Sequence, residues 1–225
     1  MLKKTIHIDI FSDPICPWCF IGNRRLARAL AARPDIEASI LWRPFQLNPN
    51  MPELGMERAR YLAEKFGDPH RIQRLYADLT KAGETVGIHF AFDKIKSTPN
   101  TLPAHLLIRL AQKNLKTKTD YQRRDRLIEA LFVGYFVEGR DIGAHSELIK
   151  IGYDAGLSKQ QIAEYLDNGY DVQEVLTEDL HARHIGVSGI PYFILNGRLA
   201  LMGAQEPEAF DPLFDALILE SSLST

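Results

Sequence analysis

The chain has 225 residues, of which 45% are hydrophobic and 25% charged, and its formal net charge is −2 at neutral pH. These proportions are ordinary for a folded globular protein, and a chain of this length buries a core without disulfide reinforcement. The near-neutral charge gives no reason to expect nucleic acid or a membrane surface as a partner, and no apolar run reaches the roughly 20 residues of a membrane-spanning helix.

The N-terminal part of the chain has the pattern of a β-α-β unit. Residues 5–11 alternate between isoleucine and more polar side chains, which predicts a strand. A helix is expected over residues 17–32, because the apolar side chains recur at helical spacing and Pro34 ends the pattern. The β-branched and aromatic residues of 36–45 predict a second strand, which a turn-rich segment follows.

The middle of the chain, about residues 56–185, is expected to be almost wholly helical. Apolar side chains recur there at helical spacing in several stretches. Ser158 and Gln161 have the spacing of a capping box, and Asn168–Gly169 predicts the end of the helix that they begin. No linker rich in Pro, Gly or Ser borders this block, so we expect it to be inserted into the first domain.

The C-terminal part of the chain is expected to add a β-β-α unit. The runs IPYFIL and RLALM are separated by Asn196–Gly197, which is a strong β-hairpin signal because both turn positions need a positive φ. An amphipathic helix is expected over residues 207–219. The element order predicts an α/β fold in which residues 1–55 and 186–225 form β-α-β and β-β-α halves of one central mixed sheet, with an all-helical insertion domain over 56–185.

Both cysteines of the chain lie in the stretch SDPICPWCFIGNRRL, where only Pro17 and Trp18 separate Cys16 from Cys19. A disulfide between them would stabilise the fold only weakly, because closing so short a loop contributes only about 2 kcal/mol to the free energy of unfolding in the chain-entropy model. Residues three apart in a helix also have Cβ atoms about 5–6 Å apart, whereas a disulfide needs roughly 3.5–4.5 Å. The bridge therefore requires Cys16 at the non-helical N-cap, and strain would make it reducible.

A structural zinc site is the second interpretation of the cysteine pair. A CxxC sequence normally supplies half of a tetrahedral site, and a second CxxC or two histidines often supply the other half. The chain has no third cysteine, and His181 and His184 are its only closely spaced histidines. We therefore expect no bound metal, and a zinc-binding or chaperone-like interaction domain is kept as an alternative.

Thiol–disulfide exchange explains more of these residues. With Cys16 at the N-cap, Pro17 occupies the first helical position, where its missing N–H costs nothing. The N–H groups of Trp18 and Cys19 are expected to point at the Cys16 sulfur, where the helix macrodipole also stabilises a thiolate. We predict that Cys16 is the nucleophile and Cys19 the resolving thiol, with Pro17 and Trp18 as active-site support. The spacing fits Trp18 either as a wall facing the substrate or as a core residue.

Six stretches of the chain, taken in their order and spacing, resemble the DsbA-like thioredoxin-fold oxidoreductases of the FrnE type. They extend from about Ile6 to Gln205 and read SDPICPWCFIGNRRL, WRPFQLNP, NTLPAHLL, LFVGYFVEGRDI, GVSGIPYFILNGR and MGAQ. The resemblance implies a thioredoxin fold with a helical insertion, in agreement with the element order. It also implies a thiol–disulfide oxidoreductase or isomerase that uses a redox-active Cys16–Cys19 disulfide and no other cofactor.

The same resemblance implies roles for residues outside the CxxC sequence. Pro191 in GIPYF is expected to be a cis-proline that faces the cysteines, and the backbone of Ile190 is expected to pair with substrate as a strand would. Asn100 and His105 in NTLPAHLL are expected to approach the active-site groove as substrate-binding residues. A helix cap and a hydrogen-bonded core histidine explain Asn100 and His105 equally well from the residues alone.

A neighbouring group with the same architecture gives the main alternative function. Kappa-class glutathione transferases and 2-hydroxychromene-2-carboxylate isomerases are similar in the helical insertion but typically have a serine at the reactive helix tip. This chain has Cys16 there, with Cys19 behind it, which favours dithiol chemistry. Glutathione-dependent isomerase or transferase activity, with glutathione as co-substrate, is the alternative that this resemblance leaves open.

The first residues predict a cytoplasmic location. The start, MLKKTIHIDIF, has the lysines of a signal peptide, but His7 and Asp9 interrupt the apolar region that should follow, and no small-residue cleavage site is present. A reducing compartment suits a reductase, an isomerase or an oxidative-stress thiol better than a net oxidant. The expected partners are proteins or peptides that contain thiols or disulfides, and the pattern leaves the oligomeric state open.

Overall fold

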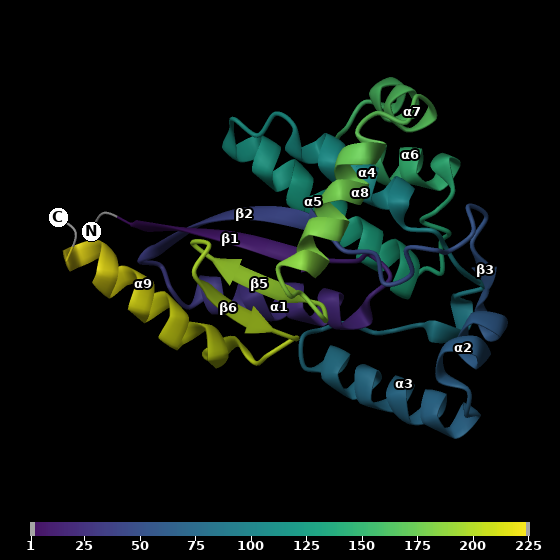
Figure 1. The fold of residues 1–225 in the computed structure, drawn as a ribbon, viewed down its shortest axis with the longest axis horizontal. Helices are drawn as coiled ribbons and strands as arrows, with labels where there is room; N and C mark the ends of the chain where they lie inside the picture. The colour runs from purple at the N-terminus through teal and green to yellow at the C-terminus, as the bar shows by residue number, and fades with distance from the viewer. Residues whose placement is uncertain (1–2, 224–225) are drawn as a thin grey trace.

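A mixed four-stranded sheet forms the centre of the computed structural model, which describes residues 3–223 (Figure 1). The strand order is β2-β1-β5-β6; β1 is parallel to β2, whereas β5 is antiparallel to both β1 and β6. The mixed sheet predicted from the sequence is therefore confirmed. Its strands are β1 (Lys4–Ser12), β2 (Ile36–Pro44), β5 (Tyr192–Leu195) and β6 (Leu199–Met202).

Helices follow the order expected from the sequence. The segment between β2 and β5 is mainly helical, but it also contains one short antiparallel pair of strands and one 3-10 turn that the sequence did not indicate. The helices are α1 (Pro17–Ala31), α2 (Arg58–Phe66), α3 (Pro69–Glu84), α4 (Leu102–Gln112), α5 (Lys118–Phe136), α6 (His145–Asp154), α7 (Lys159–Asp167), α8 (Val172–His184) and α9 (Asp211–Leu223). The short elements are β3 (Met56–Glu57), β4 (Ser97–Thr98), η1 (Phe92–Lys94) and η2 (Pro207–Phe210).

The local signals of the sequence set the ends of several elements. The Ser158 hydroxyl accepts a hydrogen bond from the Gln161 N–H at 3.4 Å, so the predicted cap of α7 is confirmed. Asn196 and Gly197 have φ values of 49° and 67°, as the predicted hairpin between β5 and β6 requires. The C-terminal helix differs from the expected 207–219, because a 3-10 turn precedes α9 and α9 continues to Leu223.

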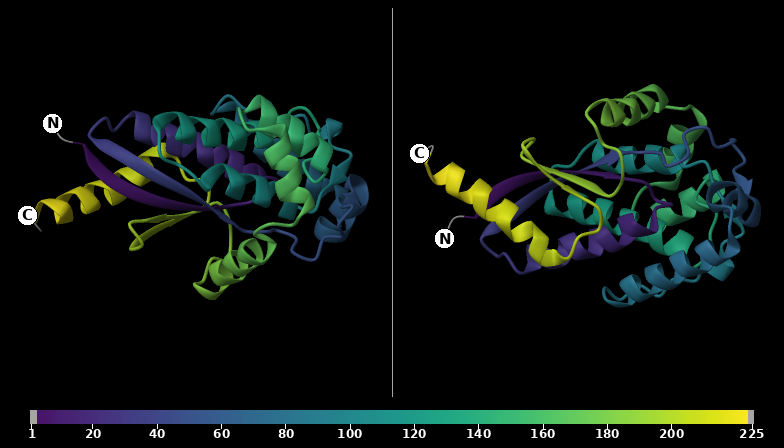
Figure 2. Two further views of the ribbon diagram at one scale, coloured as in Figure 1. Left: turned by 90° about the horizontal axis from the view of Figure 1, so that it is seen from above. Right: turned by 60° about the horizontal axis from the view of Figure 1, so that its bottom comes forward.

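The central strand β1 is covered on both faces. Ile6, Ile8 and Ile10 are each 1% exposed and belong to the main core, which α1 and α9 close. Phe11 points to the opposite face and packs with Ala182 of α8. Helices α1 and α9 therefore lie on one side of the sheet and α8 on the other (Figure 2). This layering brings the C-terminal end of β1 against helices from both parts of the chain.

The core is continuous between the sheet and the helical segment. Phe20 of α1 stacks on Phe132 of α5, with the ring centroids 5.1 Å apart and the ring planes 4° apart. The domain boundaries expected from the sequence stay a prediction, and residues 1, 2, 224 and 225 of that predicted outer domain lie outside the described residues. Within residues 3–223, none of the helices is both long enough and apolar enough to cross a bilayer.

Candidate active site

The turn between β1 and α1 holds the two cysteines. The Cys16 N–H donates to the Asp13 carbonyl oxygen at 2.9 Å, and the Ile15 N–H donates to the Asp13 carboxylate at 3.3 Å. These bonds hold Cys16 in an extended conformation, with φ −92° and ψ 111°, at the N-cap of α1. Pro17 occupies the first helical position, so the predicted places of Cys16 at the N-cap and of Pro17 directly after it are confirmed.

Both cysteines are free thiols and both are buried. Cys16 is 4% exposed and Cys19 is 1% exposed. The expectation that backbone N–H groups bond to the Cys16 sulfur is wrong, because the Cys19 N–H donates instead to the Cys16 carbonyl oxygen at 3.0 Å. The Cys16 thiol faces the Ile190 carbonyl oxygen at 3.8 Å. A protonated thiol is a weak acceptor and a weak donor, so it turns toward a carbonyl rather than toward N–H groups.

The thiolate form of Cys19 is strongly disfavoured. Burial raises the pKa of Cys19 well above its usual value, and the adjacent Cys16 raises it further. The Ser12 hydroxyl and the Asp13 backbone partly offset this by lowering the Cys19 pKa. Cys19 therefore stays protonated at neutral pH.

The loop before β5 meets the cysteines. The Ile190–Pro191 peptide bond is cis, as the resemblance implied. The Pro191 carbonyl accepts from the Gly203 N–H at 2.8 Å, which fixes the loop to the strand beside it. Gly22 of α1 lies directly against the proline, since a Cβ atom there would be only 2.8 Å from the Pro191 side chain. The glycine is what allows α1 to approach the loop closely.

For the thiol–disulfide exchange predicted from the sequence, we expect the Gly22→Ala variant to lose at least about tenfold in activity while it stays folded. The added methyl group pushes Pro191 away from α1, and a displacement of about 1 Å at a reacting centre is enough for a large loss. The measurement is insulin reduction alongside thermal unfolding. Gly87→Ala is not a fair comparison because Gly87 has a positive φ, so the control is Gly134→Ala in α5, where the atoms nearest to an added Cβ belong to the Ile151 and Arg140 side chains, at 3.3 Å and more. Equal activity of Gly22→Ala and wild type would contradict this packing role.

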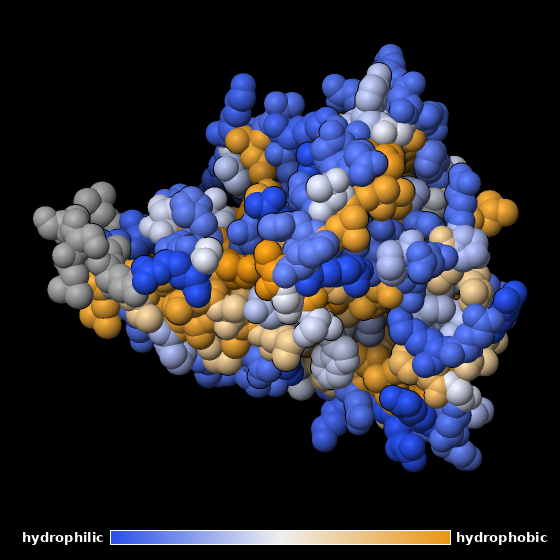
Figure 3. Space-filling view, in the orientation of Figure 1, coloured by the Kyte–Doolittle hydropathy of each residue, from blue (hydrophilic) through white to orange (hydrophobic). Residues whose placement is uncertain are grey.

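Large apolar side chains are exposed on and next to α8 and on β6. Leu180 of α8 is 54% exposed, Ile185 directly after α8 is 48% exposed, and Met202 of β6 is 55% exposed. Figure 3 shows apolar side chains gathered across the middle of this face, between the charged surfaces of the helices above and below. Trp18 is partly buried and packs against the main core. Of these side chains, Met202 pairs with Tyr192 and so lies next to the cis-proline.

Asn100 and His105 lie at the beginning of α4. The Asn100 amide donates to the Met51 carbonyl oxygen at 2.8 Å and accepts from the Leu102 N–H at 2.9 Å, so it ties the start of α4 to the loop after β2. His105 is 4% exposed, and its Nε2 atom is 3.8 Å from the Asp13 carboxylate. His105 therefore lies beneath the cysteine turn, next to a carboxyl group.

A cluster of buried polar side chains lies behind the cysteines, and only His105 of this cluster was among the residues expected from the sequence. Its members come from β1, the loop after β2, α4 and α8. They are Ser12, Asp13, Gln46, Thr101, His105 and Asp179, each at most 5% exposed. Asp13 in SDPIC is the one signal that sequence reasoning had available, because an acidic residue next to a buried strand end requires partners.

The charge state of this cluster follows from its burial. Burial raises the pKa of Asp13 from 3.8 to about 7, although the N–H groups of Leu47 and Ile15 partly offset the shift. Burial also lowers the pKa of His105 from 6.5 to about 4. Between about pH 4 and pH 7 both groups are therefore neutral, and the 3.8 Å contact between them is not an ion pair.

Asp13 and His105 are expected to give opposite pH dependences of stability. Between pH 4 and 6.5 the unfolded chain protonates His105 and the folded chain does not, so stability rises with pH by about 1.4 kcal/mol per unit. Between about pH 4 and 7 the folded chain keeps a proton on Asp13 that the unfolded chain has lost, so stability falls at a similar rate. The two contributions nearly cancel up to pH 6.5.

The His105→Gln variant lacks the contribution of His105, so the decrease in stability with rising pH that Asp13 causes should become measurable. Relative to wild type, its free energy of unfolding should decrease by about 3 kcal/mol between pH 4.5 and 6.5 in urea titrations. Asp13→Asn is the matched control and should change in the opposite direction over the same range. Parallel pH curves for wild type and His105→Gln would show that His105 is not held neutral by burial.

Across residues 3–223, no three His, Cys, Asp or Glu side chains are grouped as ligands for an ion. His181 and His184 both lie on the exposed face of α8, and the His184 ring bonds to the Leu180 carbonyl oxygen at 2.8 Å. The two histidines of α8 and the two cysteines at the start of α1 therefore belong to separate parts of the fold.

Comparison with known proteins places these features in a family context. The family model described as a DSBA-like thioredoxin domain matches residues 7–215. The uncharacterized protein YwbO of Bacillus subtilis is 25% identical over 210 residues, which cover 92% of this chain and 94% of YwbO. The crystal structure of a probable DsbA oxidoreductase from Streptomyces coelicolor has a TM-score of 0.79 and 25% identity, and the match covers 91% of this chain and 86% of that one. The cytosolic disulfide reductase DsbM of Pseudomonas aeruginosa, solved with GSH, shares the fold with a TM-score of 0.60 at 20% identity, over 99% of this chain and 100% of that one.

Proposed function

The chain belongs to the family of DSBA-like thioredoxin domains, and on that premise we propose that it is a thiol–disulfide oxidoreductase or isomerase acting on protein and peptide disulfides. The observation that carries the proposal is the position of two free thiols at the turn into α1, with Cys16 facing the carbonyl oxygen of the residue before the cis-proline. The proposal includes a cytoplasmic location, supported by a structural neighbour that is described as cytosolic.

The two thiols would have distinct roles in this reaction. Cys16 at the N-cap, as a thiolate, attacks a substrate disulfide, forming a mixed disulfide and releasing the first substrate thiolate. Cys19 then loses its proton and attacks the Cys16 sulfur, which forms the Cys16–Cys19 disulfide and releases the second substrate thiolate. An external thiol of the glutathione class would reduce this disulfide again. The backbone of Ile190 would hold the substrate as an added strand beside β5.

The direct test is catalysis of insulin disulfide reduction and of the refolding of a scrambled disulfide substrate, with reduced glutathione as the electron source. Wild-type protein should accelerate both reactions well above the glutathione background. The double variant Cys16→Ser/Cys19→Ser serves as the control and should give only the background rate. A wild-type rate equal to that of the double variant would rule out the proposal.

Glutathione-dependent transferase or isomerase activity is the second candidate. Two observations support it. Cys16 is only 4% exposed, which favours a small thiol substrate such as glutathione over a protein disulfide. A structural neighbour was also solved with GSH. The two candidates differ in their need for Cys19. Glutathione binding measured by calorimetry should survive in Cys19→Ser for a transferase or isomerase, whereas turnover of insulin disulfides should not.

A further inference from the structure

A cavity of about 240 Å³ lies between β2, α4 and α8, beside the edge strand β2 of the sheet. Much of the surface that faces it is apolar, and Trp42 of β2, Ile108 of α4 and Val175 of α8 contribute to this surface. Of the residues that the structure describes, neither cysteine lines the cavity, and neither does any residue of the cis-proline loop. The cavity is therefore distinct from the candidate active site.

The volume of this cavity suits a small organic ligand. An apolar cavity of about 150 Å³ in a protein is large enough to bind benzene. A cavity of about 240 Å³ therefore has room for one aromatic ring and a small polar substituent. Ligand pockets usually combine apolar walls with a few polar groups that fix the orientation of the ligand, so the polar side chains decide which ligand fits here.

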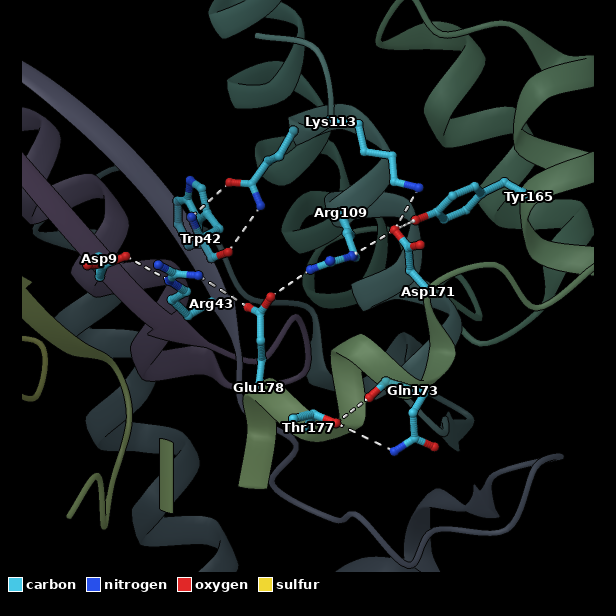
Figure 4. A network of polar contacts seen from close by, with 11 residues as sticks. Asp9, Trp42, Arg43, Arg109, Lys113, Tyr165, Asp171, Gln173, Thr177 and Glu178 are labelled. Atoms are coloured by element: carbon cyan, nitrogen blue, oxygen red, sulfur yellow. Dashed lines mark hydrogen bonds and ion pairs between the residues drawn. The ribbon is translucent and has the colours of Figure 1, made fainter. Parts of the chain in front are cut away.

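Charged side chains form the outer end of the cavity. Arg43, Arg109 and Glu178 line it, and their side chains are 34%, 29% and 29% exposed. Ile108 and Val175, by contrast, are buried, at 7% and 1% exposure. Figure 4 shows Glu178 of α8 between the two arginines, to which it bonds at 3.4 and 2.6 Å. The cavity thus opens to solvent at its charged end and is closed at its apolar end.

The lining carries more positive than negative charge. Lys113, directly after α4, joins the two arginines on the lining, and Glu178 is the only acidic residue there within the described part of the chain. Two further carboxylates, those of Asp9 and Asp171, pair with the cations but do not themselves line the cavity. An anion that enters the cavity therefore meets the positive groups directly, while two of the three compensating carboxylates lie outside the lining.

Both guanidinium groups have donors left over from their ion pairs. Arg43 uses Nε for Asp9, at 2.7 Å, and Nη1 for Glu178. Arg109 uses Nε for Asp171, at 2.8 Å, and Nη1 for Glu178. No described group accepts a hydrogen bond from the Nη2 atom of either arginine. The ion pairs hold the two planar groups in place, and a carboxylate is the ligand that suits the remaining donors.

The buried part of the cavity favours a ligand with a single charge. His105 lines it and is 4% exposed, and burial lowers the pKa of His105 to about 4, so the imidazole is neutral at neutral pH. Two polar atoms of the lining side chains, Nε1 of Trp42 and Nε2 of His105, are buried without a hydrogen-bond partner among the described residues, so the unused polar groups in the wall are neutral. A second carboxylate placed there would lose its hydration without meeting a cation, which costs far more free energy than the burial of a ring gains.

We propose that this cavity is a binding site for a small monoanionic carboxylic acid whose apolar body is about the size of one aromatic ring. The carboxylate lies at the outer end, between Arg43 and Arg109, and the ring lies against Trp42, Ile108 and Val175. The inference concerns binding alone, so it goes beyond the proposed function and does not depend on it.

The test is a titration of isotope-labelled protein with benzoate, followed by NMR of the indole N–H signals. The chain has two tryptophans: Trp42 lines the cavity, and Trp18 lies between the two cysteines in the sequence. The Trp42 signal should shift along a saturating curve with a Kd of about 1 mM or lower, the affinity range of so small a ligand, while the Trp18 signal stays in place. The Trp18→Phe variant assigns the two signals. A shift of the Trp18 signal alone, or of neither signal at about 20 mM benzoate, would overturn the proposal.

Two analogues test the charge of the ligand on wild-type protein. Benzamide has the shape of benzoate without its charge and should bind at least about tenfold more weakly, because neutral acceptors form weaker bonds with guanidinium groups. Terephthalate carries a second carboxylate on the far side of the ring and should also bind at least about tenfold more weakly, since that group meets no cation in the buried part of the cavity. Equal affinities for benzoate and benzamide would contradict an anion site, and tighter binding of terephthalate would contradict the single charge.

Variants of the chain test the place of the site. Arg109→Gln should weaken benzoate binding at least about fivefold. The control is Arg126→Gln on α5, which changes the net charge equally but lies outside the cavity lining, and it should bind like wild type. The double variant Cys16→Ser/Cys19→Ser should also bind benzoate like wild type, because the site contains neither thiol.

Thermal unfolding checks that each variant is folded, and Arg43→Gln replaces Arg109→Gln if the latter is not. The comparison of benzoate with benzamide needs no variant, so it decides the charge of the site in either case. Wild-type affinity for benzoate in a folded Arg109→Gln protein, or loss of binding in the double cysteine variant, would show that benzoate does not bind in this cavity.

Discussion

Replacing Cys16 by serine is expected to lower thiol–disulfide exchange by at least about a thousandfold, to the uncatalysed background. A serine hydroxyl is not ionised at neutral pH, and it forms no bond to sulfur that a second thiol resolves. The replacement hardly changes the volume, so the buried turn between Asp13 and Pro17 should keep its shape. The loss is therefore a loss of chemistry, which equal thermal unfolding curves for the two proteins should show.

The Cys19→Ser variant is the matched comparison and should behave differently. Cys16 still attacks the substrate, but nothing resolves the product, so a mixed disulfide of one protein and one substrate molecule should accumulate. Mass spectrometry of the acid-quenched reaction should detect this adduct in Cys19→Ser and not in Cys16→Ser. The reverse pattern, an adduct on Cys19 only, would exchange the roles assigned to the two thiols.

The second large effect is expected for Phe132→Ala, which should lower the free energy of unfolding by about 3–5 kcal/mol. Phe132 of α5 is 2% exposed and stacks on Phe20 of α1, so the truncation leaves a cavity at the contact between the sheet domain and the helical segment. For a chain of this size the corresponding decrease in melting temperature is roughly 6–20 °C.

Leu54→Ala is the control for Phe132→Ala, because Leu54 is 94% exposed and its truncation removes almost no buried contact. That variant should stay within about 0.5 kcal/mol of wild type in urea unfolding. A change of less than about 1 kcal/mol for Phe132→Ala would mean that α1 and α5 do not depend on each other for stability. A single cooperative transition in wild-type protein would support one continuous core.

The parts of the fold that depend on neighbouring residues could be read from the sequence. Strand β1 follows from the alternation of isoleucines, since one face of a strand repeats every second residue. The N-cap at Cys16 and the hairpin at Asn196 follow from backbone preferences of single residues, which act over one turn. The short β3–β4 pair was missed because its two strands are only two residues long and lie far apart in the chain.

The residues of the candidate site were likewise only partly predictable from the sequence. The spacing of Cys16 and Cys19 was enough to predict them as site residues, and the resemblance predicted Pro191. The contact of Asp13 with His105, by contrast, joins the turn after β1 to a helix of the segment between β2 and β5. No spacing rule connects two residues so distant along the chain, and a buried carboxyl is visible only after the surrounding helices are in place.

By itself, the sequence determined which longer segments are strands and helices, and that the two thiols lie at the start of one helix. Those features depend on periodicity and on the conformational preferences of single residues, which act locally. Only the tertiary structure decided that Cys16 faces the Ile190 carbonyl, that Cys19 is buried, and that Asp13 lies against His105. Those features are differences in burial and distance between segments remote in the chain, and burial is a property of the packed molecule as a whole.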